Sequence, residues 1–102
     1  MKKVVTESEI REVHVDSVDM NNIYAFRALG VIYKLHYLGA SGGLHGWAFV
    51  SLSNSFCFSN GVNVGINKDD SMILAIKSII DEGKYTVYEF VTQKEFLKWC
   101  LK

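Results

Sequence analysis

The glycine-rich segment around Ser41 has the spacing of a catalytic motif. Gly39-Ala-Ser41-Gly-Gly43 matches G-x-S-x-G, the nucleophile elbow in which a serine at a sharp strand-to-helix turn attacks a carbonyl group. An elbow needs a helix directly after the serine and a large parallel sheet that holds its acid and base. The residues after Gly46 favour a strand instead, and 102 residues are too few for such a sheet. We therefore expect no catalytic serine here.

The remaining reactive side chains do not form a catalytic or metal-binding pattern either. No two of the soft ligands have the two-to-four-residue spacing of structural zinc sites; these ligands are His14, His36, His45, Cys57 and Cys100. The acidic pairs 69–70 and 81–82 lie at the two ends of one predicted helix, where the first suits the helix dipole and the second is solvated. Neither pair indicates acid–base catalysis. We predict no enzyme activity, no metal and no cofactor.

The composition indicates one folded, neutral domain. Eleven Lys and Arg balance eleven Asp and Glu, and 49% of the 102 residues are hydrophobic, which is far from the composition of disordered chains. Acidic residues from Glu7 onward interrupt any signal core, and no apolar run approaches the roughly 20 residues of a membrane span. We therefore expect a single domain over 1–102, cytoplasmic and without a membrane partner, with Cys57 and Cys100 as free thiols rather than a disulfide.

Alternating branched and aromatic residues predict a sheet in the first two thirds of the chain. Strands are expected at 12–16, 31–38 and 47–52. A flexible glycine loop over 39–46 would separate the last two of these strands. Asn60-Gly61 stands between two apolar runs, and because Asn-Gly tolerates the positive φ angles of a tight turn, it predicts a hairpin over about 56–66. These strands form a mainly antiparallel sheet.

Helical spacing and capping signals predict the rest of the fold. A mostly buried helix is expected over about 71–82, then a strand over 85–91 and a C-terminal helix over 93–101, which begins at a Thr92–Glu95 capping box. Residues 20–29 have near-helical spacing after Asp19 and before Gly30, although the same apolar run also suits a strand. The predicted fold class is therefore α+β, in a single compact domain.

The charges are unevenly distributed. Residues 21–66 carry only Arg27 and Lys34 as charged side chains, yet they hold eight of the thirteen aromatic residues. One interpretation is a central sheet with both faces covered, by helices and by loops. The other is a sheet face or edge that meets a second chain, because interfaces are depleted in charge and enriched in aromatic residues at their centre.

The second interpretation predicts a binding protein that acts on a protein partner, as a regulator, an inhibitor or an immunity-type protein. Self-association into a homodimer is its simplest form, since an uncharged edge can pair with its own copy. The expected contact residues are Tyr33, Tyr37, His45, Trp47 and Phe49, with an adaptable loop that includes Gly39, Ser41, Gly42 and Gly43. Each of these aromatic residues would also suit a core.

A nucleic-acid alternative follows from residues 45–52. His45-Gly-Trp-Ala-Phe-Val-Ser-Leu52 resembles the octapeptide of the RNA-recognition motif, K/R-G-F/Y-G/A-F-V-x-F/Y, with His in the basic position. The resemblance implies a strand whose outward His45, Trp47 and Phe49 stack on single-stranded RNA, while Ala48, Val50 and Leu52 enter the core. It covers about residues 13–52, and the zero net charge opposes it, because nucleic-acid binding depends on cationic contacts with phosphates.

Overall fold

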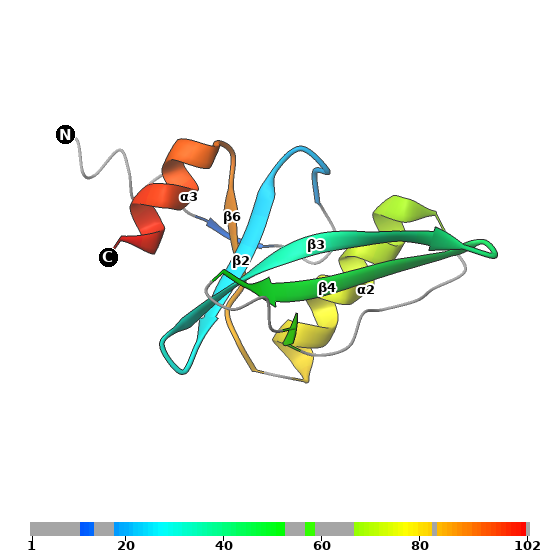
Figure 1. Cartoon of the computed structure of the whole chain (residues 1–102), viewed down its shortest axis with the longest axis horizontal. Coiled ribbons are helices and arrows are strands. Elements are labelled where there is room, and N and C mark those ends of the chain that lie inside the picture. Colours follow the sequence, from blue (N-terminus) through cyan, green and yellow to red (C-terminus); the bar gives the residue numbers. More distant parts are fainter. Residues whose placement is uncertain (1–10, 14–17, 53–56, 59–66, 83, 102) are drawn as a thin grey trace.

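The computed structural model describes residues 11–13, 18–52, 57–58, 67–82 and 84–101. The described strands are β1 (Arg11–Glu12), β2 (Ile23–Ala28), β3 (Val31–Ser41), β4 (Leu44–Ser51), β5 (Cys57–Phe58) and β6 (Tyr88–Phe90). The described helices are α2 (Lys68–Asp81) and α3 (Gln93–Cys100). The strands form one antiparallel sheet in the order β1-β6-β2-β3-β4-β5, and Figure 1 labels its middle strands β6, β2, β3 and β4. The predicted α+β class is confirmed.

Strand β2 replaces the helix predicted over 20–29. It pairs with β3 on one side and with β6 on the other, so it lies inside the sheet. Its residues Tyr24, Ala25 and Phe26 are all at most 1% exposed, which means that both faces of the strand are buried. A strand covered on both faces is a continuous apolar run, and periodicity does not separate such a run from a buried helix. The helix alternative for residues 20–29 is therefore wrong, and the strand alternative is confirmed.

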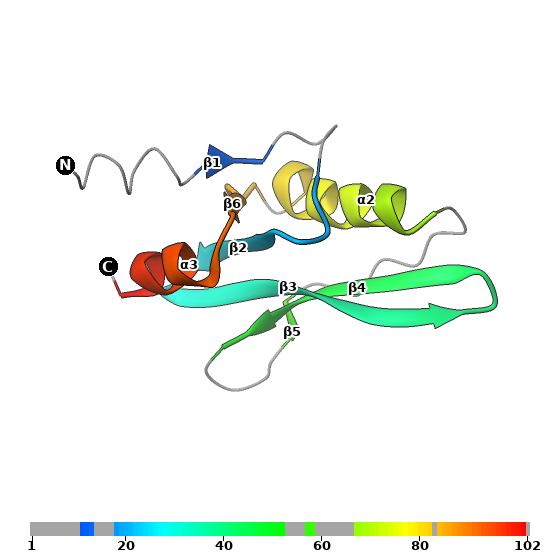
Figure 2. The same ribbon diagram turned by 90° about the horizontal axis from the view of Figure 1, so that it is seen from above.

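The two helices cover opposite faces of the sheet. Tyr24 and Phe26 belong to the core under α2, with Met72, Ile76 and Ile79. Ala25 lies between them in the strand and belongs to the core under α3, with Phe90, Phe96 and Trp99. Because successive side chains of a strand alternate between faces, this division places one helix on each side of β2. Figure 2 shows α2 lying along β3 and β4.

Local capping signals set the start of each helix. The Asn67 side chain caps α2 by accepting a hydrogen bond from the Asp70 amide at 2.8 Å, so this helix begins three residues before the predicted 71. In α3 the predicted capping box is confirmed: Thr92 accepts from the Glu95 amide at 3.2 Å, and the Glu95 carboxylate accepts from the Thr92 amide. Helix α3 ends at Cys100, one residue before the predicted end.

The predicted glycine loop over 39–46 is wrong. Strand β3 continues to Ser41, β4 already begins at Leu44, and only Gly42 and Gly43 form the turn. Their φ angles of +58° and +82° fit a tight two-residue turn, which glycine adopts without strain. The predicted strand at 31–38 is confirmed as part of β3, and the strand predicted at 47–52 is confirmed up to Ser51, where β4 ends.

Three other predicted elements differ in length or lie outside the described residues. The strand predicted over 85–91 is shorter and runs from Tyr88 to Phe90, and β1 ends at Glu12. Most of the strand predicted over 12–16 falls outside the described residues. The Asn60-Gly61 turn of the hairpin predicted over 56–66 is outside them as well; within this range, β5 pairs antiparallel with β4.

Candidate functional site

The outer part of the β3–β4 hairpin projects beyond β2 and β6, and we call its residues 35–49 the hairpin arm (Figure 1). Within the described residues, β2 pairs with β3 only up to Ala25–Lys34, so the arm's part of β3 has β4 as its one partner strand. Strand β5 pairs with β4 only at Phe49 and Val50. Among the described residues, the arm is therefore a two-stranded ribbon, and no described strand pairs with the outer edge of most of either strand.

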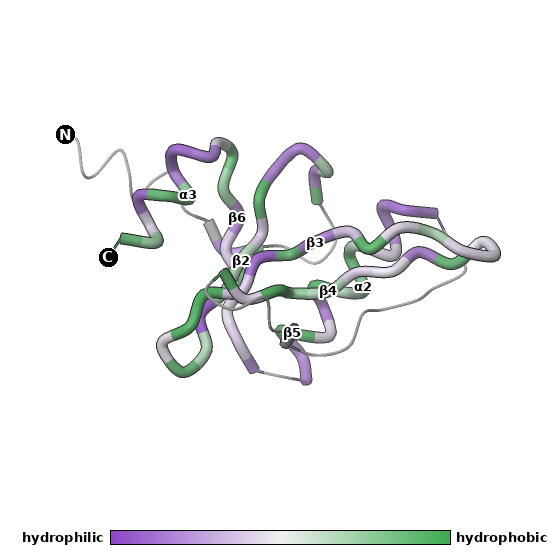
Figure 3. The backbone as a smooth tube through the Cα atoms, in the orientation of Figure 1, coloured by the Kyte–Doolittle hydropathy of each residue, from purple (hydrophilic) through white to green (hydrophobic). Residues whose placement is uncertain are grey.

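No residue of the arm carries a formal charge when its histidines are neutral. Leu38 is 59% exposed, Leu44 is 44% exposed and Tyr37 is 36% exposed, although all three are large apolar side chains. In Figure 3 the tube of the arm is mostly pale to green, with purple at isolated positions. The arm thus presents apolar side chains on an uncharged ribbon.

Helix α2 holds the base of the arm. The Trp47 indole Nε1 donates a hydrogen bond to Ser71 Oγ at 2.7 Å, and Ser71 Oγ in turn donates to the Lys68 carbonyl oxygen at 2.7 Å. Tyr37 packs on Trp47 with ring centroids 4.8 Å apart, and the Lys68 ammonium lies 4.1 Å from the Tyr37 ring centroid. This cation–π contact and the buried hydrogen bond connect the first turn of α2 to both strands.

Three of the five predicted contact residues are core residues. Tyr33 is 8% exposed, Trp47 is 4% exposed and Phe49 is 2% exposed, and all three belong to the core under α2. The prediction that they contact a partner is wrong for this structure, because α2 covers the face on which they lie. The outward stacking row implied by the RNA-recognition motif is wrong for the same reason.

The other two predicted contact residues lie together on the arm. The Tyr37 hydroxyl and His45 Nδ1 share a hydrogen bond of 2.8 Å, and both residues lie on the face that α2 partly covers. A β-bulge next to them, between Tyr37 and Gly39, inserts an extra residue into β3. A bulge changes the direction in which neighbouring side chains point. Leu38, at this bulge, is 59% exposed.

Two of the four predicted loop residues, Gly39 and Ser41, line a shallow hollow near the tip of the arm, whereas Gly42 and Gly43 form the turn. The volume of this hollow is about 370 Å³, and it is lined by Leu38, Gly39, Ala40, Ser41, Leu44 and Gly46. Ser41 ends β3 and is followed by the turn into β4 rather than by a helix, so the strand-to-helix elbow of a catalytic serine is absent at this point. The lining is apolar apart from the serine hydroxyl and the backbone.

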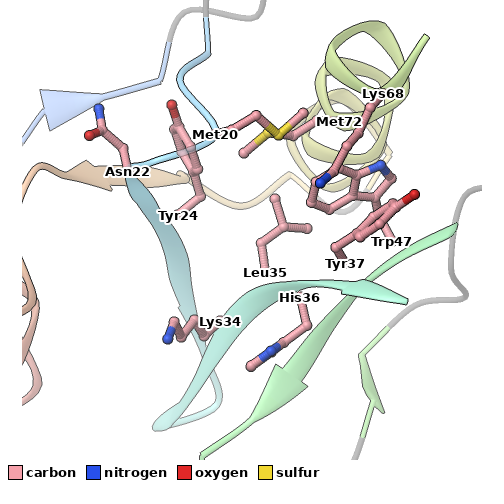
Figure 4. A pocket seen from close by; sticks show the side chains of 10 residues that line it. All are labelled: Met20, Asn22, Tyr24, Lys34, Leu35, His36, Tyr37, Trp47, Lys68 and Met72. Atoms are coloured by element: carbon pink, nitrogen blue, oxygen red, sulfur yellow. The ribbon is translucent and has the colours of Figure 1, made fainter. Parts of the chain in front are cut away.

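A second hollow lies where β2 and β3 separate, and sequence analysis missed it. Its volume is about 210 Å³, and Figure 4 shows Met20 and Tyr24 from the β2 side facing Met72 and Lys68 of α2. We call this hollow the fork groove. Lys34 and Lys68, the charged residues that bound the uncharged stretch 35–67, both line the groove.

Burial is the main cause of the pKa shifts of two side chains, His36 on the arm and Cys100 on α3. Partial burial, with a smaller contribution from the Lys34 charge, lowers the pKa of His36, so its imidazole is neutral at pH 7. Burial raises the pKa of the Cys100 thiol on α3, which keeps the thiol protonated. Among the described residues, no three His, Cys, Asp or Glu side chains are grouped so that they could hold a metal ion.

Comparison with known proteins does not reveal a relative. No protein-family model matches the chain, and no curated protein or solved structure matches it significantly. In the described part of the chain, no helix has both the length and the apolar character needed to span a bilayer. Any functional inference therefore depends on the geometry of the arm and the fork groove.

Proposed function

We propose that this chain is a non-enzymatic binding protein that contacts a protein partner through the hairpin arm. The observation that carries the proposal is the exposure of Leu38 and Leu44 on a ribbon without a formal charge. Leu38 and Leu44 line the same hollow of the arm, and a contiguous apolar patch that is depleted in charge is typical of interface centres. A regulator, an inhibitor or an immunity-type protein would act in this way.

The open edges of the arm support the same proposal. Exposed strand edges offer unpaired N–H and C=O groups to another chain, and proteins usually protect them with lysine, proline or a bulge. The sequence contains no proline, and β3 has no lysine after Lys34. The bulge next to Leu38 is the one such protection present in the arm's part of β3. Strand addition by a partner is therefore the binding mode that this edge favours.

Single-stranded RNA is a weaker candidate. The stacking surfaces that it would need, on Trp47 and Phe49, pack under α2, and the chain has zero net charge. Binding to nucleic acid without a cationic surface lacks its main source of affinity. We therefore treat RNA as an outcome of the test below.

Site-specific photo-crosslinking in the native cell tests the proposal. A photoreactive amino acid replaces Leu38 on the arm, and a matched control carries it at Leu97, which is 50% exposed on α3. We expect a protein adduct from position 38 and none of the same mass from position 97. Equal adducts from both positions, or an adduct that ribonuclease removes, would contradict the proposal.

The partner identified in this way is then tested as a purified protein. Leu38→Glu should weaken binding by about tenfold, because truncating or charging a central interface residue costs on the order of 1–2 kcal/mol. The control Leu97→Glu should change affinity by less than about twofold. Circular dichroism of both variants checks that the fold is retained. If the adduct joins two copies of this chain, light scattering at two concentrations should show a dimer.

A further inference from the structure

The fork groove lies at the point where the sheet divides. The pairing of β2 with β3 ends at Ala25–Lys34. Tyr24, the preceding residue of β2, pairs only with Glu89 of β6 among the described strands. Beyond Lys34, β3 continues into the arm with β4 as its one described partner. Up to Lys34, β2 pairs with one edge of β3. From Leu35 onward, no described strand pairs with that edge. An extended chain placed there would continue the sheet without displacing a described strand.

One side of this groove is apolar and adaptable. Met20 and Met72 face each other across it, and Leu35 and Tyr24 form its floor and inner wall, as Figure 4 shows. The groove volume of about 210 Å³ exceeds the roughly 150 Å³ of a cavity that holds benzene, so it accommodates one large apolar side chain. Methionine side chains are flexible and polarisable, and they adapt to different apolar groups.

The opposite side of the sheet at this edge carries the single positive charge of Lys34, whose Nζ lies 5.7 Å from the ring centroid of Phe96 on α3. Strand alternation places Lys34 and His36 on the face away from α2, and in Figure 4 both side chains point away from Met72. None of the residues that line the groove is acidic. Two acidic residues lie near the inner end: the Glu89 carboxylate accepts hydrogen bonds from Tyr24 at 2.8 Å and Asn22 at 3.1 Å, and the Asp19 amide donates to the Tyr24 hydroxyl at 2.8 Å.

We propose that the fork groove binds an extended peptide segment of the protein partner as an added strand beside β3. Alternate residues of this segment are apolar and fill the space between Met20 and Met72. The residues between them face the other side of the sheet, where acidic side chains lie next to Lys34. This inference rests on the proposed function and specifies the chemistry of the partner: a segment in which apolar and acidic residues alternate.

Synthetic peptides test this recognition on the full chain. The probe is a fluorescein-labelled eight-residue peptide in which Glu and Leu alternate, and binding is followed by fluorescence anisotropy at low salt. Two matched peptides serve as controls: one has Lys in place of Glu, and the other is N-methylated at alternate peptide bonds. We expect saturable binding of the Glu peptide, at least tenfold weaker binding of the Lys peptide, and a similar loss on N-methylation, which removes ladder donors.

Protein variants locate the site. Lys34→Glu should weaken binding of the Glu peptide about fivefold, and the milder Lys34→Gln about twofold, as cross-strand charge pairs do. The control Lys77→Glu, on the exposed part of α2, should leave the affinity unchanged. Equal binding of the Glu and Lys peptides, unchanged binding after N-methylation, or equal effects of Lys34→Glu and Lys77→Glu would overturn the inference.

The two proposals fail separately. If no peptide binds while the Leu38 adduct with a protein partner persists, the peptide inference is wrong and the arm remains a protein-binding surface. If the peptide binds as expected while position 38 gives no adduct, the fork groove stands and the arm is not part of the interface. Failure of both measurements would remove the binding function proposed for this region.

Discussion

The indole Nε1 of Trp47 and the Oγ of Ser71 lie 2.7 Å apart, and their hydrogen bond joins the arm to helix α2 inside the core. Trp47 is 4% exposed and Ser71 is fully buried at 0%. Because Ser71 also donates to the carbonyl of Lys68, both polar groups are satisfied without water. The bond holds the base of the arm against the helix.

Loss of this serine should therefore destabilise the fold. Ser71→Ala leaves the buried indole N–H without its acceptor, and we expect the free energy of unfolding to fall by about 1–3 kcal/mol. Urea denaturation followed by tryptophan fluorescence measures it. Ser78→Ala is the matched control, because Ser78 donates to a carbonyl of its own helix, and its cost should be under about 1 kcal/mol. Equal costs for the two variants would argue against a structural role for the Trp47 bond.

The turn between β2 and β3 should be improved by substitution. Leu29 has a φ angle of +53°, is 98% exposed and precedes Gly30, whose φ angle is +77°. A left-handed backbone costs a residue such as leucine on the order of 1–2 kcal/mol, and asparagine tolerates it in tight hairpin turns. We expect Leu29→Asn to raise the free energy of unfolding by about 0.5–1 kcal/mol. Gly30→Ala should lower it, and thermal denaturation of both variants checks the pair.

Tyr24 should make the protein sensitive to alkaline pH. Burial, together with its hydrogen bond to Glu89, raises the pKa of the Tyr24 phenol well above its ordinary value of about 10. The neutral phenol is therefore favoured in the folded state, and its contribution to stability is fully present below about pH 10 and lost as the pH rises further. Tyr24→Phe should show a smaller loss of stability than the wild type between pH 9 and 11, measured by urea denaturation at each pH. Parallel pH profiles would refute this assignment.

The capping box of α3 gives a further stability prediction. Glu95 is only 8% exposed, and its carboxylate accepts from the Val91 and Thr92 amides at 3.0 and 3.4 Å. Glu95→Ala should lower the free energy of unfolding by about 1–2 kcal/mol, because both amides lose their acceptor. Lys94→Ala, on the exposed side of the same turn, should change it by less than about 0.5 kcal/mol. Chemical denaturation compares the two.

Features that depend on neighbouring residues could be predicted from the sequence. The Thr92–Glu95 capping box lies within four residues, and the strand after Val31 has a local alternating pattern, so both were predicted. Alternation also placed Trp47 and Phe49 on one face of their strand. It does not say which face a helix covers, since this depends on how α2 packs, and that is why their exposure was predicted wrongly.

The fork groove could not be predicted for the same reason. Met20 and Met72 meet only because β2 and β3 separate beneath the first turns of α2. The two residues are 52 positions apart, and the local pattern around each predicts its own element but not the contact between the two elements. The charge distribution was informative at a coarser level, because it identified the region 21–66 that contains the arm without locating its exposed residues.

The position of β6 in the sheet has a consequence for the order of folding. Strands β2, β3 and β4 are neighbours in both sequence and space, so their hairpins close short loops and should form early. The pairing of β2 with β6 joins residues that are 65 positions apart, such as Tyr24 and Glu89. Until that late contact forms, the β2 edge of the early three-stranded unit lacks β6, and the face that α3 covers is exposed, so this unit should be the species most prone to aggregate during refolding.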